Sequence, residues 1–201
     1  MPLAVPDQLH CTSWEILSQQ DLFRIIRSLL ASELAASRCQ PRNSLPWRVW
    51  SEATPLDESS FGAGLDSLDL LRAAAALNEM FHLHETGIED YLLARRTLQG
   101  WVATVTASLA RKAERISFRT SGSTGEPRRC THLLSSLIEE ADYFAAAFPG
   151  RSRLVSLVPP HHIYGFLWTV LLPQRAGIPV LDLDGAVLSA PSQLQPGDLV
   201  V

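Results

Sequence analysis

One segment in the second half of the chain has the composition of an anion-binding loop. Residues 120–128 read Thr-Ser-Gly-Ser-Thr-Gly-Glu-Pro-Arg, with four hydroxyl side chains and two glycines. Glycines let backbone N–H groups approach an anion, hydroxyls donate further hydrogen bonds, and a guanidinium neutralises the remaining charge. The segment predicts a phosphate-binding loop formed by Thr120, Ser121, Gly122, Ser123, Thr124, Gly125 and Arg128. A flexible serine–glycine connector is the alternative.

A serine in the first half lies at the expected start of a helix. Residues 64–68 read Gly-Leu-Asp-Ser-Leu and precede an apolar segment with helical spacing. Asp or Ser at such a position commonly caps the free N–H groups of the first turn. From residue chemistry alone, Asp66 and Ser67 are therefore helix-capping residues.

Two patterns of apolar residues predict the helices and strands that hold the loop and Ser67. Apolar residues recur at helical spacing before residue 110, whereas short strands alternate with helices after residue 111. The sequence predicts helices over 13–37, 66–81, 88–93, 98–109, 130–148 and 163–175. It predicts strands over 116–120, 154–158 and 178–183, and residues 197–201 have the composition of the start of another strand.

The order of these elements predicts a fold of class α + α/β. Residues 13–110 would form a small four-helix bundle, interrupted by an unusually long loop over 39–64. Residues 111–201 would form parallel βαβ units. Three strands are few for a complete domain of this kind, so we expect the second domain to be incomplete.

The composition excludes several other classes of protein. With 46% hydrophobic and 19% charged residues, the 201-residue chain can bury a core. A net charge of −4 without a basic block argues against a nucleic-acid partner. Three widely spaced cysteines fit neither a disulfide framework nor a zinc cluster, and no metal site is predicted. The longest apolar run, residues 163–173, is too short for a membrane span, and we expect a cytoplasmic protein.

The loop at residues 120–128 resembles the phosphate loop of the adenylate-forming enzymes, the superfamily of acyl-CoA synthetases, aryl-CoA ligases and peptide-synthetase adenylation domains. Their signature is Ser/Thr-Ser-Gly-Thr/Ser-Thr-Gly-X-Pro-Lys-Gly, which residues 120–127 match completely. Arg128 replaces the lysine and Arg129 the glycine, so the positive charge is kept while its geometry changes. The Gly-Lys-Ser/Thr ending of Walker loops and the spacing of the dinucleotide fingerprint are both absent.

The same resemblance continues in residues 158–165, which read Val-Pro-Pro-His-His-Ile-Tyr-Gly. This is similar to a family segment in which a strand and a proline precede His-Ile-Tyr/Phe, and the histidine lines the acyl or aryl pocket. The resemblance implies a substrate pocket at His162, with Tyr164 and Gly165 beside it. His161 has no family counterpart. The alternative is a strand-end histidine that binds no ligand.

Residues 64–68 resemble a second family, the acyl carrier proteins, in which a serine at the start of the second helix carries phosphopantetheine. The resemblance implies attachment at Ser67, with Asp66 and Leu68 as recognition flanks. Residues 52–90 contain nine acidic side chains and one arginine, and carriers use such a face to meet basic partners. The implied partners are a phosphopantetheinyl transferase and acyl-transfer enzymes. The first helix is longer than usual, and a bundle whose serine only caps is the alternative.

Together the resemblances imply the N-terminal fragment of an ATP-dependent acyl-adenylate-forming ligase, fused to a phosphopantetheine carrier domain. The parent reaction would convert a carboxylic acid and ATP, with Mg²⁺, to acyl-AMP and pyrophosphate. The acyl group would then pass to the thiol of coenzyme A or of phosphopantetheine on Ser67. Lys112, the only lysine, precedes the loop and cannot be the family's C-terminal lysine, so we expect the chain alone to be inactive. A carrier or interaction module with an inactive AMP-binding remnant is the alternative.

Overall fold

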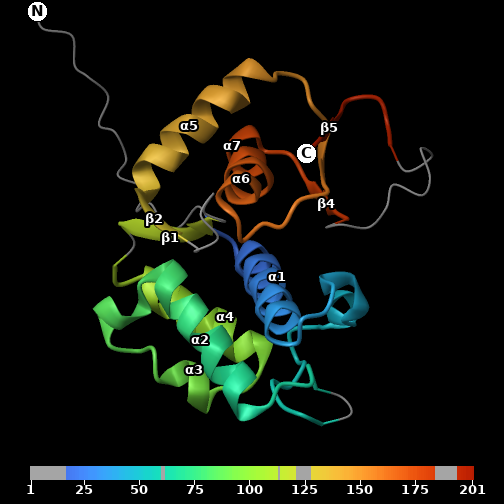
Figure 1. Ribbon diagram of the computed structural model, residues 1–201. Coiled ribbons are helices and arrows are strands. Elements are labelled where there is room, and N and C mark those ends of the chain that lie inside the picture. The colour runs from blue at the N-terminus through green and yellow to red at the C-terminus, as the bar shows by residue number, and fades with distance from the viewer. Residues whose placement is uncertain (1–16, 60–61, 113, 121–127, 184–193) are drawn as a thin grey trace, which may run out of the picture.

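The computed structural model describes residues 17–59, 62–112, 114–120, 128–183 and 194–201. Figure 1 shows α1 (Gln19–Ser37) at the centre of the molecule, with α2 (Ser67–Phe81), α3 (Tyr91–Ala94) and α4 (Leu98–Leu109) on one side of it. The 3-10 turns η1 (Arg42–Ser44) and η2 (Trp47–Val49) lie within the long segment after α1, and η3 (Leu83–Thr86) follows α2. Each described helix is too short or too polar to cross a membrane.

The three longer helices of the first half begin at capping residues. The Ser18 side chain accepts a hydrogen bond from the Asp21 backbone N–H and the Asp21 side chain accepts one from the Ser18 N–H, which forms a capping box at α1. Asp66 caps α2 by accepting a hydrogen bond from the Asp69 N–H at 2.7 Å. Thr97 caps α4 in the same way. The predicted starts at residues 66 and 98 are therefore confirmed.

The second half begins with an antiparallel hairpin. β1 (Arg115–Thr120) pairs with β2 (Arg128–Leu133), and α5 (Leu134–Ala147) follows directly. The helix expected over 130–148 is therefore wrong at its start, and the expected phosphate loop joins two strands rather than a strand and a helix. The apolar positions that α5 buries begin only at Leu134, while the largely exposed residues of β2 satisfy their backbone groups by pairing with β1.

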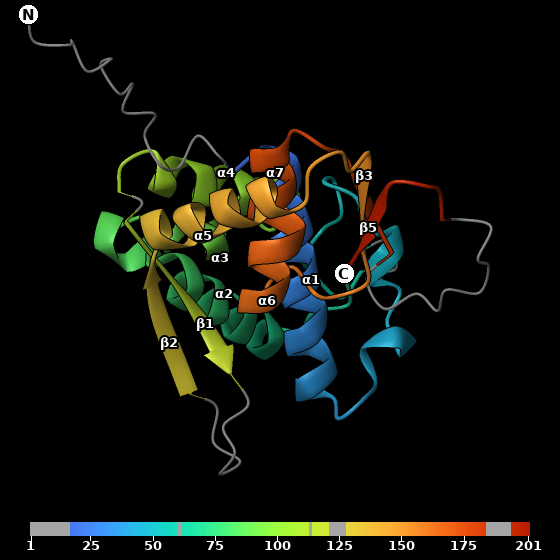
Figure 2. The same cartoon turned by 90° about the horizontal axis from the view of Figure 1, so that it is seen from above.

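A separate parallel sheet has the strand order β4–β3–β5, formed by β3 (Arg153–Ser156), β4 (Val180–Asp182) and β5 (Asp198–Val200). The crossover from β3 to β4 contains an unbroken helical stretch formed by α6 (Ile163–Phe166), the π-helical turn η4 (Leu167–Leu171) and α7 (Leu172–Ala176). The expected parallel βαβ unit is thus present. Figure 2 shows this sheet and the β1–β2 hairpin on opposite sides of the molecule. The expectation that β1 belongs to the parallel sheet is therefore wrong.

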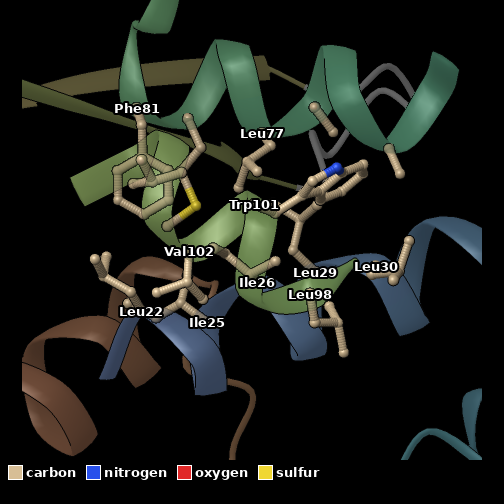
Figure 3. Packing of buried hydrophobic residues seen from close by; sticks show 14 of the residues in the cluster. Leu22, Ile25, Ile26, Leu29, Leu30, Leu77, Phe81, Leu98, Trp101 and Val102 are labelled. Atoms are coloured by element: carbon tan, nitrogen blue, oxygen red, sulfur yellow. The ribbon is translucent and has the colours of Figure 1, made fainter. Parts of the chain in front are cut away.

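The hydrophobic core is one cluster that extends across both halves. Figure 3 shows its helical part, where apolar side chains of α1 meet those of α2 and α4, including Leu77 and the fully buried Trp101. The same cluster includes Phe118 of β1 and Phe166 of α6, whose rings lie 5.4 Å apart between centroids. The four helices expected before residue 110 are present, although α1 begins only at Gln19 and α3 has only the four residues Tyr91–Ala94. A carrier-type bundle and a domain boundary at 110/111 stay predictions.

Candidate active site

The two ends of the expected phosphate loop lie opposite each other at one end of the hairpin. Thr120 is paired with Arg128, and the Thr120 hydroxyl donates a hydrogen bond to the Arg128 carbonyl oxygen at 3.2 Å. The side chain of Arg128 is exposed. The intervening candidate residues lie outside the described part of the chain: Ser121, Gly122, Ser123, Thr124 and Gly125. The hairpin therefore holds both attachment points of the loop next to the exposed side chain of Arg128.

A pocket of about 230 Å³ lies beside this hairpin, between α1, α2, β1, β2 and the segment before α6. Its apolar lining comes mainly from the two helices and from the buried ring of β1: Leu29, Ala36, Ala76, Met80 and Phe118. Its polar lining comes from all sides: Ser32, Glu33, Glu79, Ser117, Arg119, Arg129, His161 and His162. Such a mixture can hold an apolar group of a ligand and orient a polar end.

Of the three pocket residues inferred from the family resemblance, His162 lines this pocket. Tyr164 and Gly165 are not among its lining residues, and Tyr164 is 55% exposed. Gly165 is buried in α6, where an added Cβ would lie 2.0 Å from the Pro159 carbonyl oxygen. Glycine is needed there because the backbone of α6 packs against the preceding turn, which is a structural role.

His161 is a pocket residue that the sequence did not assign. Its Nδ1 is hydrogen-bonded to the Ser28 hydroxyl of α1 at 2.9 Å, and the same hydroxyl accepts a hydrogen bond from Arg42 at 2.7 Å. The ring of His161 lies 4.2 Å from that of His162, measured between centroids. Burial, together with the nearby His162 and Arg42, lowers the pKa of His161 well below its usual value. A neutral imidazole thus lies beside His162 in the wall of the pocket.

Charged side chains form the polar part of the pocket around Arg119. The Arg119 Nε donates to Glu79 Oε2 at 2.8 Å, and its Nη1 donates to Glu33 Oε1 at 3.2 Å. Arg129 Nε lies 4.0 Å from Glu79 Oε1. Burial raises the pKa of Glu33, an effect that Arg119 opposes and Glu79 reinforces. The two arginines and the two glutamates thus form a cluster of ion pairs with no net formal charge in the wall of the pocket, next to the loop ends.

Sequence reasoning missed the contribution of α1 and α2 to this pocket. Their apolar residues have the spacing of a helix core, so nothing marks Leu29 or Met80 as facing a cavity. The one available signal is an acidic residue next to each apolar face, at Glu33 and Glu79. A half-buried carboxylate in such a place needs a cationic partner, and Arg119 is that partner.

The carrier candidate lies apart from the pocket. Ser67 is the exposed first residue of α2, beside the capping Asp66, and Leu68 is 59% exposed. Ala76, the first residue of α2 that lines the pocket, is nine positions further along the helix, or roughly 14 Å along its axis. The structure thus leaves Ser67 accessible and does not bring it together with His162.

The chain is similar to three curated proteins named 4-coumarate–CoA ligase. It is 36% identical over 184 residues to the one from Halorhodospira halophila, which covers 92% of this chain and 46% of the relative. It is 39% identical over 189 residues to the protein from Rhodobacter capsulatus, which covers 88% of this chain and 48% of that relative. It is 35% identical over 219 residues to the protein from Cereibacter sphaeroides, which covers 100% of this chain and 51% of that relative.

The chain thus spans about half the length of these relatives. No protein-family model matches it, and no solved structure does. The three similarities support the relationship to adenylate-forming ligases inferred from the loop. One of them extends over the whole chain, and therefore includes the helical segment before residue 110.

Proposed function

We propose that the chain is part of an ATP-dependent ligase that activates a carboxylic acid as acyl-AMP and then forms a thioester. In the first step a carboxylate oxygen attacks the α-phosphorus of ATP and pyrophosphate leaves. In the second a thiol attacks the acyl carbon, AMP leaves and the thiol proton is released. The observation that carries the proposal is the position of the loop ends, Thr120 and Arg128, beside a pocket that contains His162.

The described residues suit both substrates of the first step, ATP and a carboxylic acid. The exposed guanidinium of Arg128 and that of Arg129 can neutralise ATP phosphates at the loop. The pocket carboxylates Glu33 and Glu79 are engaged by Arg119, so Mg²⁺ would arrive bound to phosphate oxygens rather than to a protein cage. The relatives are named for 4-coumarate and coenzyme A, and we infer an aryl or acyl carboxylate as substrate and coenzyme A as the thiol.

Binding of Mg·ATP to the 201-residue chain tests the phosphate loop directly. In calorimetry, the double variant Ser123→Ala with Thr124→Ala should lose most of the affinity, because two hydroxyl donors are removed. A matched double variant, Ser135→Ala with Ser136→Ala, changes exposed hydroxyls on α5 and should bind normally. An unaltered chain that does not bind Mg·ATP, or equal loss in both doubles, would contradict the proposal.

A carrier role for Ser67 is the second candidate, and the exposure of Ser67 and Leu68 at the start of α2 favours it. Incubation with a phosphopantetheinyl transferase and coenzyme A should then add one prosthetic group to the chain, and none to Ser67→Ala. Intact mass spectrometry measures this. An unchanged mass with several transferases would contradict the carrier role. Ser67 would then be only the first residue of α2, in a helical segment that is similar to part of a protein named as a ligase.

A further inference from the structure

Two histidines and a carboxylate meet at η3, on the side of the first half that faces β1. One ring nitrogen of His82, one of His84 and a carboxylate oxygen of Glu85 all lie within 4.8 Å of one another. His82 has a left-handed backbone conformation, with φ of 53°, which is uncommon for a residue other than glycine. This conformation ends α2 and starts η3, and it turns three potential metal ligands toward one another.

Hydrogen bonds outside the cluster orient both imidazoles. The Asn78 amide oxygen accepts a hydrogen bond from the His84 backbone N–H at 2.8 Å and lies 3.2 Å from His84 Nδ1. Because an amide oxygen only accepts, Nδ1 carries the proton and the lone pair of His84 is on Nε2. His82 Nε2 is 2.9 Å from the Ser117 hydroxyl, which in turn is 2.8 Å from the Thr131 hydroxyl. Such outer partners are typical of metal-binding histidines.

The spacing of His82 and Glu85 is that of two ligands of one small ion. His82 Nδ1 lies 3.5 Å from Glu85 Oε1. Neighbouring ligands of a tetrahedral Zn²⁺ ion with bonds of about 2.0–2.1 Å are about 3.4 Å apart. We propose that His82, His84 and Glu85 form a site for a borderline divalent cation such as Zn²⁺. Two imidazoles and a carboxylate leave a fourth position for water, and the site is independent of the function proposed above.

Two cations of the chain compete for the same carboxylate. Lys112 Nζ lies 2.7 Å from Glu85 Oε2, and Arg115 Nη2 lies 2.7 Å from Glu85 Oε1. Both side chains are more than two-fifths exposed, so they can swing into solvent when an ion takes the carboxylate. The competition predicts that removing the ammonium of Lys112 strengthens metal binding, whereas an ion bound elsewhere on the chain would not respond.

The test titrates Zn²⁺ into the untagged 201-residue chain against a chromophoric chelator, without ATP or carboxylic acid. We expect one equivalent to bind, with affinity reduced about tenfold or more in His84→Ala and in Glu85→Gln. His82→Asn should act likewise, because Asn tolerates the left-handed conformation but lacks the imidazole. Lys112→Met should increase the affinity by about two- to fivefold.

His132→Gln is the matched control, because His132 lies on β2 outside the cluster. Co²⁺ bound to the unaltered chain should show the visible absorption of a tetrahedral ion, and this absorption should be lost in His84→Ala. Circular dichroism confirms that the exposed His84→Ala variant is folded. No stoichiometric binding, or binding reduced equally by His132→Gln, would overturn the site, and neither result bears on ATP binding.

Discussion

Gly165 belongs to a segment that resembles a family pocket motif, yet its surroundings give it a packing role. Its place in the segment with His162 suggested a pocket residue, yet it is buried, and the missing Cβ lets α6 pack against Pro159. His161, which no motif assigns, does line the pocket and is held by Ser28. The resemblance singles out His162 alone, whereas the packing of the chain places both His161 and His162 in the wall of the pocket.

Substitution of Gly165 tests this structural role. Gly165→Ala should lower the free energy of unfolding by about 1–3 kcal/mol, because the new methyl group must displace the backbone of Pro159. Gly150→Ala is the comparison, since nothing lies within 4 Å there and only the left-handed φ of 73° opposes the change, at about 1–2 kcal/mol. Urea denaturation measures both. A smaller loss in Gly165→Ala than in Gly150→Ala would contradict the close contact with Pro159.

His161 makes the stability of the chain depend on pH. Burial, the first cause, holds its pKa in the folded chain well below the usual 6.5, whereas the unfolded chain takes up a proton near that value. Protons therefore stabilise the unfolded state. Stability is fully present above about pH 6.5 and falls as the pH drops below it, by up to about 1.4 kcal/mol per pH unit for this group.

Denaturation midpoints between about pH 7.5 and 5.5 measure the slope, which should be smaller in His161→Asn. A residual slope is expected because burial also lowers the pKa of His82. An unchanged slope in His161→Asn would show that His161 is protonated equally in both states and would contradict its burial as a neutral imidazole.

At the scale of elements, α1 connects the two halves of the chain through a buried ion pair. Arg24 of α1 donates from Nε to Asp182 of β4 at 3.1 Å and from Nη1 to the Thr169 carbonyl oxygen of η4 at 3.0 Å. The side chain of Arg24 is only 7% exposed and that of Asp182 16%. One guanidinium thus holds the central helix, the crossover helix and the parallel sheet together.

Arg24→Met should lower the free energy of unfolding by about 1–3 kcal/mol, because it removes the buried hydrogen bond to the Thr169 carbonyl oxygen and leaves Asp182 paired with the more distant Arg27 at 3.5 Å. Arg175→Met provides the matched exposed case, since Arg175 pairs with Asp142 where both side chains are at least two-fifths exposed. That change should cost less than about 1 kcal/mol. Urea denaturation measures both variants. Equal decreases in the free energy of unfolding would show that burial of the Arg24 pair adds no stability.

The elements differ in how well the sequence predicts them. α4 begins and ends where its apolar spacing indicates, because one face of it is buried against α1 and Thr97 caps it. For residues 130–133 of β2 the sequence predicts helix instead, because most of these residues are exposed and an exposed strand has no alternating apolar face to show its period. Only pairing with β1 defines it, and pairing partners cannot be read from one segment alone.

At the scale of the whole molecule, the core crosses the expected boundary at 110/111. Trp101 and Leu77 belong to the same buried cluster as Phe118 and Phe166. Residues 13–110 nevertheless contain α1, α2 and α4, which bury apolar side chains against one another (Figure 3). The apolar contacts among these three helices are therefore part of a cluster that continues into the second half of the chain.

Expression of residues 13–110 alone tests the domain division. We expect cooperative unfolding, followed by circular dichroism, at a lower urea concentration than in the 201-residue chain, because the contacts with Phe118 and Phe166 are lost. A segment that unfolds without a cooperative transition would show that the 201 residues form one folding unit. A midpoint equal to that of the whole chain would show that the shared contacts contribute no stability.

The pocket wall is assembled from both sides of residue 110: α1 and α2 supply Leu29 and Met80, while the hairpin and the segment before α6 supply Phe118 and His162. Recombination between related genes at this point would therefore yield chimaeras in which the loop and His162 are inherited intact but half of the cavity wall comes from another parent. Exchanging the first 110 residues would thus change part of the cavity wall while residues 120–128 and His162 stay the same.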